Sequence, residues 1–163
     1  DMWQGLDKKR ALGAFHWSFL AQPAPLPERL IQSDPEFFAT RLMTRWAAPD
    51  FKFKPDAMAE YLRCFAKPEV ISATCEDYRA GAGIDDQLDR EDFEAGRRLQ
   101  CPVHFLWGSC RNLGGPQGVA DPLQVWQRWA DDVSGAPIDC GHFLAEEAPA
   151  QVIDWVHKFF VEG

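Results

Sequence analysis

Apolar residues recur at helical spacing through most of the first 99 residues, and short proline-rich or glycine-rich stretches separate the helical segments. Segment 22–27 contains three prolines and predicts a loop. Ser33-Asp34-Pro35-Glu36 combines a capping residue with a proline in the first turn, which predicts a helix start. Gly81-Ala82-Gly83 predicts a helix end. The expected helices are 2–20, 27–31, 35–46, 55–65, 69–80 and a charged segment, 89–98.

The pattern changes after residue 99. Residues 102–107 form a short apolar run ended by Gly108, which indicates a buried strand of a parallel sheet. A second strand is expected at 137–140. The intervening segment predicts a glycine-rich loop at 112–118 and a helix that Asp121-Pro122 caps, and a last helix is expected at 149–161.

The order of elements predicts an α/β chain with a helical region, 1–99, and a second region, 100–163, that holds the last two strands of a mostly parallel sheet. Two strands do not make a stable sheet by themselves. Because the chain also opens at Asp1 inside an expected helix, we expect a fragment whose partner strands lie in a preceding amino-terminal segment.

Composition narrows the classes of function. The 163 residues are 46% hydrophobic and 26% charged, which favours a folded domain. A formal net charge of -8 argues against nucleic acid as a partner. The five cysteines are scattered and contain no CxxC pair, so we expect free thiols in a reducing cytoplasm and no zinc site. No apolar run reaches the length of a membrane span, and the first twelve residues do not have the pattern of a signal peptide.

His142 is the strongest candidate for chemistry. It follows Gly141 directly after the second expected strand, and open α/β sheets bind ligands at the carboxyl ends of their strands. Glycine allows the chain to turn there, and imidazole exchanges protons near neutral pH. Spacing alone also allows a histidine whose hydrogen bonds are satisfied within the loop. His104 and His157 are expected to be structural or exposed.

Several segments resemble the haloacetate (fluoroacetate) dehalogenase family of the α/β-hydrolase fold. The histidine loop Gly-His-Phe-Leu-Ala-Glu-Glu-Ala-Pro and the strand ending in Trp-Gly resemble those of the fold in general. The other stretches resemble the dehalogenases and extend the match over most of the chain. The matching segments are 15–19, 22–30, 34–35, 75–81, 102–108 and 141–149. The resemblance implies that 1–99 is the helical cap over the active site and 100–163 the end of the core.

The same resemblance implies a mechanism and a set of site residues. An aspartate carboxylate attacks the carbon that carries the halogen, and His142 activates the water that hydrolyses the resulting ester. His16 and Trp17 match N–H donors to the departing halide, and Trp46 matches an aromatic residue of the pocket. The implied partners are a small haloacid and its halide, no cofactor or metal is expected, and a homodimer is possible. Without the resemblance, the His16-Trp17 pair is better explained as packing of the cap.

The chain departs from the family pattern where the other catalytic groups belong. The nucleophile, the arginines that bind the substrate carboxylate, and the aspartate that orients the histidine are all expected before Asp1. Many α/β-hydrolases place the orienting acid after the Trp-Gly strand, but Ser109-Cys110-Arg111-Asn112 contains no carboxylate. Asp121 is better explained as a helix cap before Pro122.

Two further departures concern the pocket. Gly83 stands where the family has a halide-binding tyrosine, and Met2 stands where it has another pocket tyrosine. Fluoride is the most demanding halide leaving group. The loss of a donor therefore predicts a preference for chloroacetate or a bulkier substrate.

Two alternatives stay open. An epoxide hydrolase shares the fold, the aspartate nucleophile and the histidine, but it uses cap tyrosines, and this chain has only Tyr61 and Tyr78. The resemblance assigns Tyr78 to a matched segment, and the His16-Trp17 pair suits a halide better. The second alternative is an inactive fragment that needs its amino-terminal half. The acidic pairs Asp85-Asp86 and Glu146-Glu147 are expected to be solvated or to begin helices.

Overall fold

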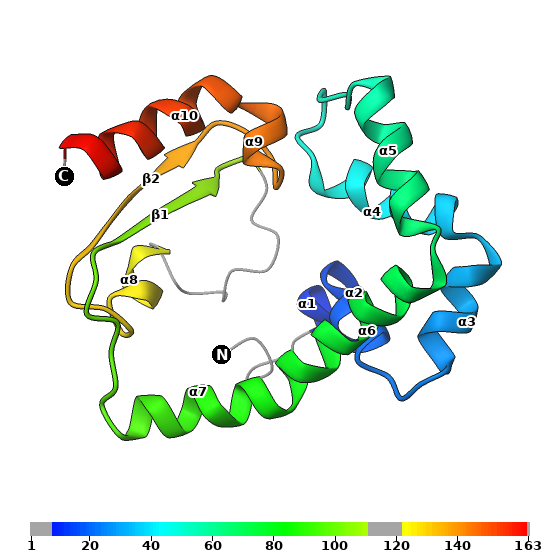
Figure 1. Ribbon diagram of the computed structural model, residues 1–163, viewed down its shortest axis with the longest axis horizontal. Helices are drawn as coiled ribbons and strands as arrows, with labels where there is room; N and C mark the ends of the chain where they lie inside the picture. The colour runs from blue at the N-terminus through cyan, green and yellow to red at the C-terminus, as the bar shows by residue number, and fades with distance from the viewer. Residues whose placement is uncertain (1–7, 111–121, 163) are drawn as a thin grey trace. The chain divides into compact units, whose positions relative to one another are not determined.

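The computed structural model describes residues 8–110 and 122–162 (Figure 1). These residues form two compact units. Unit 1 is drawn from Asp1–Thr44 and Lys52–Glu91, and unit 2 from Arg45–Phe51 and Asp92–Gly163. No pattern in the sequence indicates that the short segment Arg45–Phe51 groups with the strands of the second unit.

Unit 1 is helical, and four of its helices have a proline in the first turn. Pro55 and Pro68 occupy the first turns of two helices, where the missing N–H has no intrahelical partner to lose. Asp34 accepts a hydrogen bond from the N–H of Phe37 at 3.0 Å, as the predicted cap requires. The helices are α1 (Lys8–Gly13), α2 (Phe15–Leu20), α3 (Leu26–Ser33), α4 (Pro35–Trp46), α5 (Pro55–Phe65), α6 (Pro68–Ala82) and α7 (Ile84–Glu94).

Two of the expected helix boundaries are wrong. The single helix expected at 2–20 is interrupted at Ala14, whose φ of -114° and ψ of 35° are not helical. Glycine in a helix interior costs about 1 kcal/mol relative to alanine, so Gly13 makes this a weak point. Helix α7 begins at Ile84, five residues before the expected start. Its first turn contains Asp85 and Asp86, and negative charge is favourable at a helix amino terminus.

The core of unit 1 joins three helices. Leu20 of α2, Ile31 of α3, and Ile71 and Cys75 of α6 are each at most 2% exposed and form one apolar cluster. Beside it, Arg79 donates to a carboxylate oxygen of Glu28 at 2.6 Å and to the carbonyl of Gln22 at 2.8 Å. Packing and a shielded ion pair therefore fix α6 against α2 and α3.

Unit 2 contains two parallel strands with helices on both faces (Figure 1). Strand β1 (Val103–Gly108) pairs with β2 (Val133–Ile138) so that Val103 lies opposite Val133. Adjacent strand residues point to opposite faces. The described helices of the unit are α8 (Leu123–Trp126), α9 (Leu144–Glu147) and α10 (Pro149–His157), and α10 continues into a π-helical turn, η1 (Lys158–Glu162).

Aromatic contacts identify the helix on each face of the sheet. The ring of His104 lies 5.1 Å from Trp155 of α10 and 5.4 Å from Phe159 of η1, measured between centroids. The next residue, Phe105, lies 5.6 Å from Trp126 of α8. This helix–sheet–helix layering is the α/β arrangement that the sequence predicted.

The position of the second strand was predicted incorrectly. It runs over Val133–Ile138, not over 137–140, because the polar Ser134 and the small Gly135 hide it from a search for apolar runs. Gly135 is required by close backbone contact: a Cβ at this position would lie 2.1 Å from the carbonyl oxygen of Phe105. Within 8–110 and 122–162, every helix is too short or too polar to cross a membrane.

Candidate active site

His142 lies in the loop that joins β2 to α9. Cys140 and Gly141 are buried, whereas His142 is exposed. The N–H of His142 donates to the carbonyl of Trp46 at 2.9 Å, and the two rings lie 5.5 Å apart at 64°. Phe143 also contacts the histidine, with centroids 5.4 Å apart and planes at 85°, and the rings of Phe143 and Trp46 lie 6.4 Å from each other. The imidazole at the carboxyl end of β2 therefore belongs to a cluster of three rings.

Two glycines make the close approach of this loop possible. A Cβ on Gly108, the last residue of β1, would lie 1.8 Å from the carbonyl oxygen of Gly141. A Cβ on Gly141 would lie 2.3 Å from the nitrogen of Ala48 and 2.5 Å from the carbonyl carbon of Ala47. The Trp-Gly strand end and the Gly-His loop are thus in direct backbone contact, which explains why both motifs contain glycine.

The carboxylate of Glu147 accepts hydrogen bonds from the backbone of this loop. Oε2 of Glu147 accepts the N–H groups of Gly141 at 2.7 Å and Ala48 at 2.9 Å, and Oε1 accepts that of Phe143 at 2.9 Å. The Glu146-Glu147 pair was expected to be solvated or to begin a helix; both residues lie in the first turn of α9, where Glu147 is half-buried. In the bond to Phe143, a carboxylate in the first turn of α9 reaches back to the N–H of the N-cap residue. The N-cap is phenylalanine and Glu147 follows it by four residues, so the Ser/Thr-x-x-Glu pattern of a capping box did not signal this bond.

The local charge also affects the neighbouring thiol. Burial, and secondarily the negative charge of Glu147, raise the pKa of Cys140 to about 11. Cys140 therefore stays a neutral thiol at physiological pH, and its role in the loop is packing.

A second group of candidate residues lies in unit 1. His16 is 8% exposed, and its ring lies 6.2 Å from that of Trp17. Tyr78 of α6 lies edge-on to both, with centroids 5.8 Å from His16 and 5.5 Å from Trp17 at about 80°. Burial, and secondarily the negative charge of Asp77, raise the pKa of Tyr78, so its hydroxyl keeps its proton.

Tyr78 was not among the residues predicted for the site. It follows Ile71 and Cys75 at helical spacing, and these two are fully buried on α6. The 3.6-residue period therefore places Tyr78 on the inner face of that helix, which is a signal the sequence contains.

The predicted site residues belong to both units. Trp46 lies in unit 2 against His142, and His16 and Trp17 lie in unit 1. That all of them line one pocket stays a prediction. Asp121, Arg111, Asn112, Met2 and the expected loop 112–118 lie outside the described residues. Gly83 is the carboxyl-terminal cap of α6.

The other histidines agree with structural or surface roles. Nδ1 of His104 lies 2.7 Å from the hydroxyl of Ser134, and its ring packs on Trp155 and Phe159. His157 is exposed at the end of α10. In the described part of the chain, no three histidine, cysteine or acidic side chains are grouped so that they could hold a metal ion.

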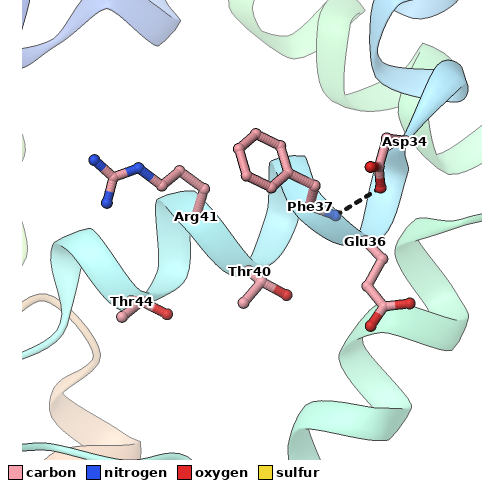
Figure 2. Close-up of a pocket in the computed structure, with 6 residues that line it drawn as sticks. All are labelled: Asp34, Glu36, Phe37, Thr40, Arg41 and Thr44. Atoms are coloured by element: carbon pink, nitrogen blue, oxygen red, sulfur yellow. Dashed lines mark hydrogen bonds between the residues drawn. The ribbon is translucent and has the colours of Figure 1, made fainter.

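A hollow of about 480 Å³ lies on unit 1, and none of the predicted site residues lines it. Figure 2 shows that all its lining side chains come from α4 and the residue before it. Phe37, which lines it, is 66% exposed. Because one helix face supplies every lining group, no side chains from separate elements converge there, and His142 and the His16-Trp17 pair remain the candidates for chemistry. The lining residues are Asp34, Glu36, Phe37, Thr40, Arg41 and Thr44.

Known proteins resemble the chain over nearly its whole length. It is 34% identical to the fluoroacetate dehalogenase of a Burkholderia species over 163 residues, which cover 99% of this chain and 52% of that protein. It is 33% identical to the soluble epoxide hydrolase of Corynebacterium sp. strain C12, over 80% of this chain and 43% of that protein. No protein-family model matches the chain.

A solved structure supports the same conclusion. A provisionally assigned α/β hydrolase from Nostoc sp. PCC 7120 superposes with a TM-score of 0.90 at 42% identity, over 99% of this chain and 54% of that one. The chain spans about half the length of the curated relatives that it matches. The resemblance seen in the motifs and the predicted fold are both confirmed: this chain is a homologue of fluoroacetate dehalogenase and belongs to the α/β-hydrolase fold.

Proposed function

We propose that the protein containing this chain cleaves the carbon–halogen bond of short haloacids. The observation that carries the proposal is the cluster of His16, Trp17 and Tyr78. These three side chains carry imidazole N–H, indole N–H and phenol O–H donors, and their ring centroids lie 5.5–6.2 Å from one another in unit 1. Such donors stabilise a departing halide, which leaves with the electron pair of the broken bond.

The proposed reaction has two steps. A carboxylate from a part of the fold outside residues 1–163 attacks the carbon that carries the halogen, so that a carbon–oxygen bond forms and halide leaves. His142 then takes a proton from water, whose oxygen attacks the carbonyl carbon of the ester. The carboxylate is restored and the 2-hydroxy acid is released, so haloacetate and water give glycolate, halide and a proton. Trp46 lies against the imidazole and covers part of it.

Tyr78 affects the prediction about halide preference that was drawn from Gly83. The resemblance expects a tyrosine donor near position 83, and Tyr78 lies five residues earlier with its ring against both His16 and Trp17. If Tyr78 supplies the third donor, the preference for chloroacetate that Gly83 suggested does not follow. The two positions therefore make separable predictions about the halide.

Epoxide hydrolysis is the second candidate, and one observation favours it. Tyr78 retains its proton to high pH and is able to protonate the oxygen of an opening epoxide. Chloride release from chloroacetate, measured against diol formation from styrene oxide with the full-length protein, decides between the two. Diol formation without halide release would overturn the dehalogenase proposal.

An isotope test addresses the ester directly. In H₂¹⁸O, a single turnover through an enzyme ester places ¹⁸O in the protein carboxylate, because water attacks the ester carbonyl. Direct attack of water on the substrate carbon would place ¹⁸O in glycolate instead. Label in the product of the first turnover would therefore contradict the proposed mechanism.

A further inference from the structure

Glu147 holds the loop that carries His142. Its two carboxylate oxygens accept three backbone N–H groups, those of Gly141, Phe143 and Ala48, at 2.7–2.9 Å. The N–H between them, that of His142, donates to the carbonyl of Trp46 at 2.9 Å. The N–H groups of the three consecutive residues 141–143 are therefore all bound by acceptors that lie outside the loop.

This arrangement matters because the loop has no regular structure of its own. Residues 139–143 belong to neither a helix nor a strand, so no ladder of backbone hydrogen bonds fixes the direction of the histidine side chain. Hydrogen bonds to an ionised acceptor are about twice as strong as neutral ones. Gly141 is buried, so its N–H would lose its partner without gaining water if the carboxylate were removed.

Glu147 also connects two segments that are far apart in the sequence. The same Oε2 atom binds Gly141 of the histidine loop and Ala48 of the segment that follows α4. That segment includes Trp46, whose ring contacts the imidazole. One carboxylate thus fixes both the loop that carries the imidazole and the segment that carries the aromatic ring against it.

We propose that Glu147 is the positioning residue for His142. The inference rests on the proposed function only in that His142 activates water; the binding of the loop does not depend on the substrate. Because its oxygens are occupied by backbone N–H groups, Glu147 acts on the direction of the imidazole and not on the substrate.

The test uses Glu147→Gln and Glu147→Ala in the full-length protein, with Glu94→Gln as the matched control. Glu94 is exposed at the end of α7 and undergoes the same loss of charge. Glutamine has the size of glutamate, but its NH₂ cannot accept a hydrogen bond, so at least one of the three bonds is lost. Alanine loses all three.

A displaced imidazole slows the hydrolysis of the ester and leaves its formation unchanged. We expect kcat on chloroacetate to fall about tenfold in Glu147→Gln and about a hundredfold in Glu147→Ala, with little change in KM. Rapid mixing is expected to show a stoichiometric burst of halide followed by slow turnover. Hydrogen exchange of the amides in 141–143 is expected to become about tenfold faster or more, and Glu94→Gln is expected to match the unmodified protein.

The outcomes separate the two proposals. An unchanged kcat in Glu147→Ala, or a rise in KM without a burst, overturns the positioning role. If the unmodified protein releases no halide, the proposed function fails, and the positioning role is then tested by hydrogen exchange of the amides in 141–143. Unchanged exchange in the Glu147 variants overturns the inference, and faster exchange supports it. If Glu147→Ala does not fold, the isosteric Glu147→Gln carries the same measurements.

Discussion

Replacing Gly108 with alanine tests whether the end of β1 and the histidine loop are in backbone contact. The added Cβ would lie 1.8 Å from the carbonyl oxygen of Gly141 and 2.8 Å from that of Cys140. Heavy atoms that are not bonded to each other prefer a separation of about 3.5 Å, so the strand and the loop must move apart by more than about 1 Å. Both clashing atoms belong to the backbone, which cannot relieve the contact by changing a rotamer.

The size of the effect follows from that displacement. Overpacking of this kind destabilises a protein by about 1–3 kcal/mol. A shift of about 1 Å in a catalytic group reduces the rate about a hundredfold. We therefore expect Gly108→Ala to lower both the free energy of unfolding, measured by urea denaturation of the full-length protein, and kcat for halide release.

Gly81→Ala is the matched control. Gly81 lies within α6, and a Cβ there meets no atom within 4 Å outside its own helix and chain neighbours. The same substitution should stabilise the protein by about 0.5–1 kcal/mol, because alanine loses less backbone entropy in a helix. If Gly108→Ala is as stable and as active as the unmodified protein, the close contact between strand and loop is wrong, and with it the explanation of the Trp-Gly motif.

Three other changes test the donor cluster and the core of unit 1. Trp17→Phe keeps an aromatic ring and removes the N–H donor. We therefore expect kcat for halide release to fall about tenfold or more, while the free energy of unfolding changes little. An unchanged kcat would show that Trp17 does not bind the halide. If Tyr78 supplies the third donor, Tyr78→Phe lowers fluoride release more than chloride release, and Gly83→Tyr changes neither. Faster fluoride release in Gly83→Tyr would instead support the prediction that Gly83 leaves the pocket without a halide donor. Burial alone would raise the pKa of Glu28, but the hydrogen bond and positive charge of Arg79 outweigh it and hold that pKa below its ordinary value of 4.5. The pair therefore contributes stability that is complete above pH 4.5 and is lost as the pH falls through the folded-state pKa. Glu28→Gln should cost about 1.5–3 kcal/mol at pH 7 and less in acid, measured by denaturation across that range, and an equal loss at pH 3 and pH 7 would contradict the assignment.

Local signals in the sequence predicted most of the helices of unit 1. Proline in the first turn and glycine at the end fix a helix boundary through backbone geometry alone, which explains the agreement for α5 and for the end of α6. The second strand escaped prediction because β2 is defined by pairing with β1. Its Gly135 is required by a carbonyl of Phe105, thirty positions away, and no local pattern reports that contact.

The site was predictable in the same uneven way. The strand–glycine–histidine order predicted a loop at His142, and the structure has a loop there with an exposed histidine; the catalytic role of His142 stays a prediction. The partners of that loop, Trp46 and Ala48, are almost a hundred residues away, and their contacts arise from tertiary packing. Helical spacing places Tyr78 on the buried face of α6, but that rule does not show what the side chain contacts. Glu147 matches no capping pattern, because its N-cap partner is Phe143 at a spacing of four residues.

The nearly equal identities to a dehalogenase and an epoxide hydrolase have a physical explanation. In the proposed mechanism either reaction ends with His142 activating the water that attacks an enzyme ester, so the features around His142 do not distinguish the two. The distinction lies where the first step places negative charge. A departing halide needs hydrogen bonds and takes no proton, whereas an opening epoxide needs an acid. The indole of Trp17 donates a hydrogen bond but does not release its proton, whereas the phenol of Tyr78 does both. Loss of the Trp17 N–H should therefore weaken dehalogenation selectively, and loss of the Tyr78 hydroxyl should weaken either reaction.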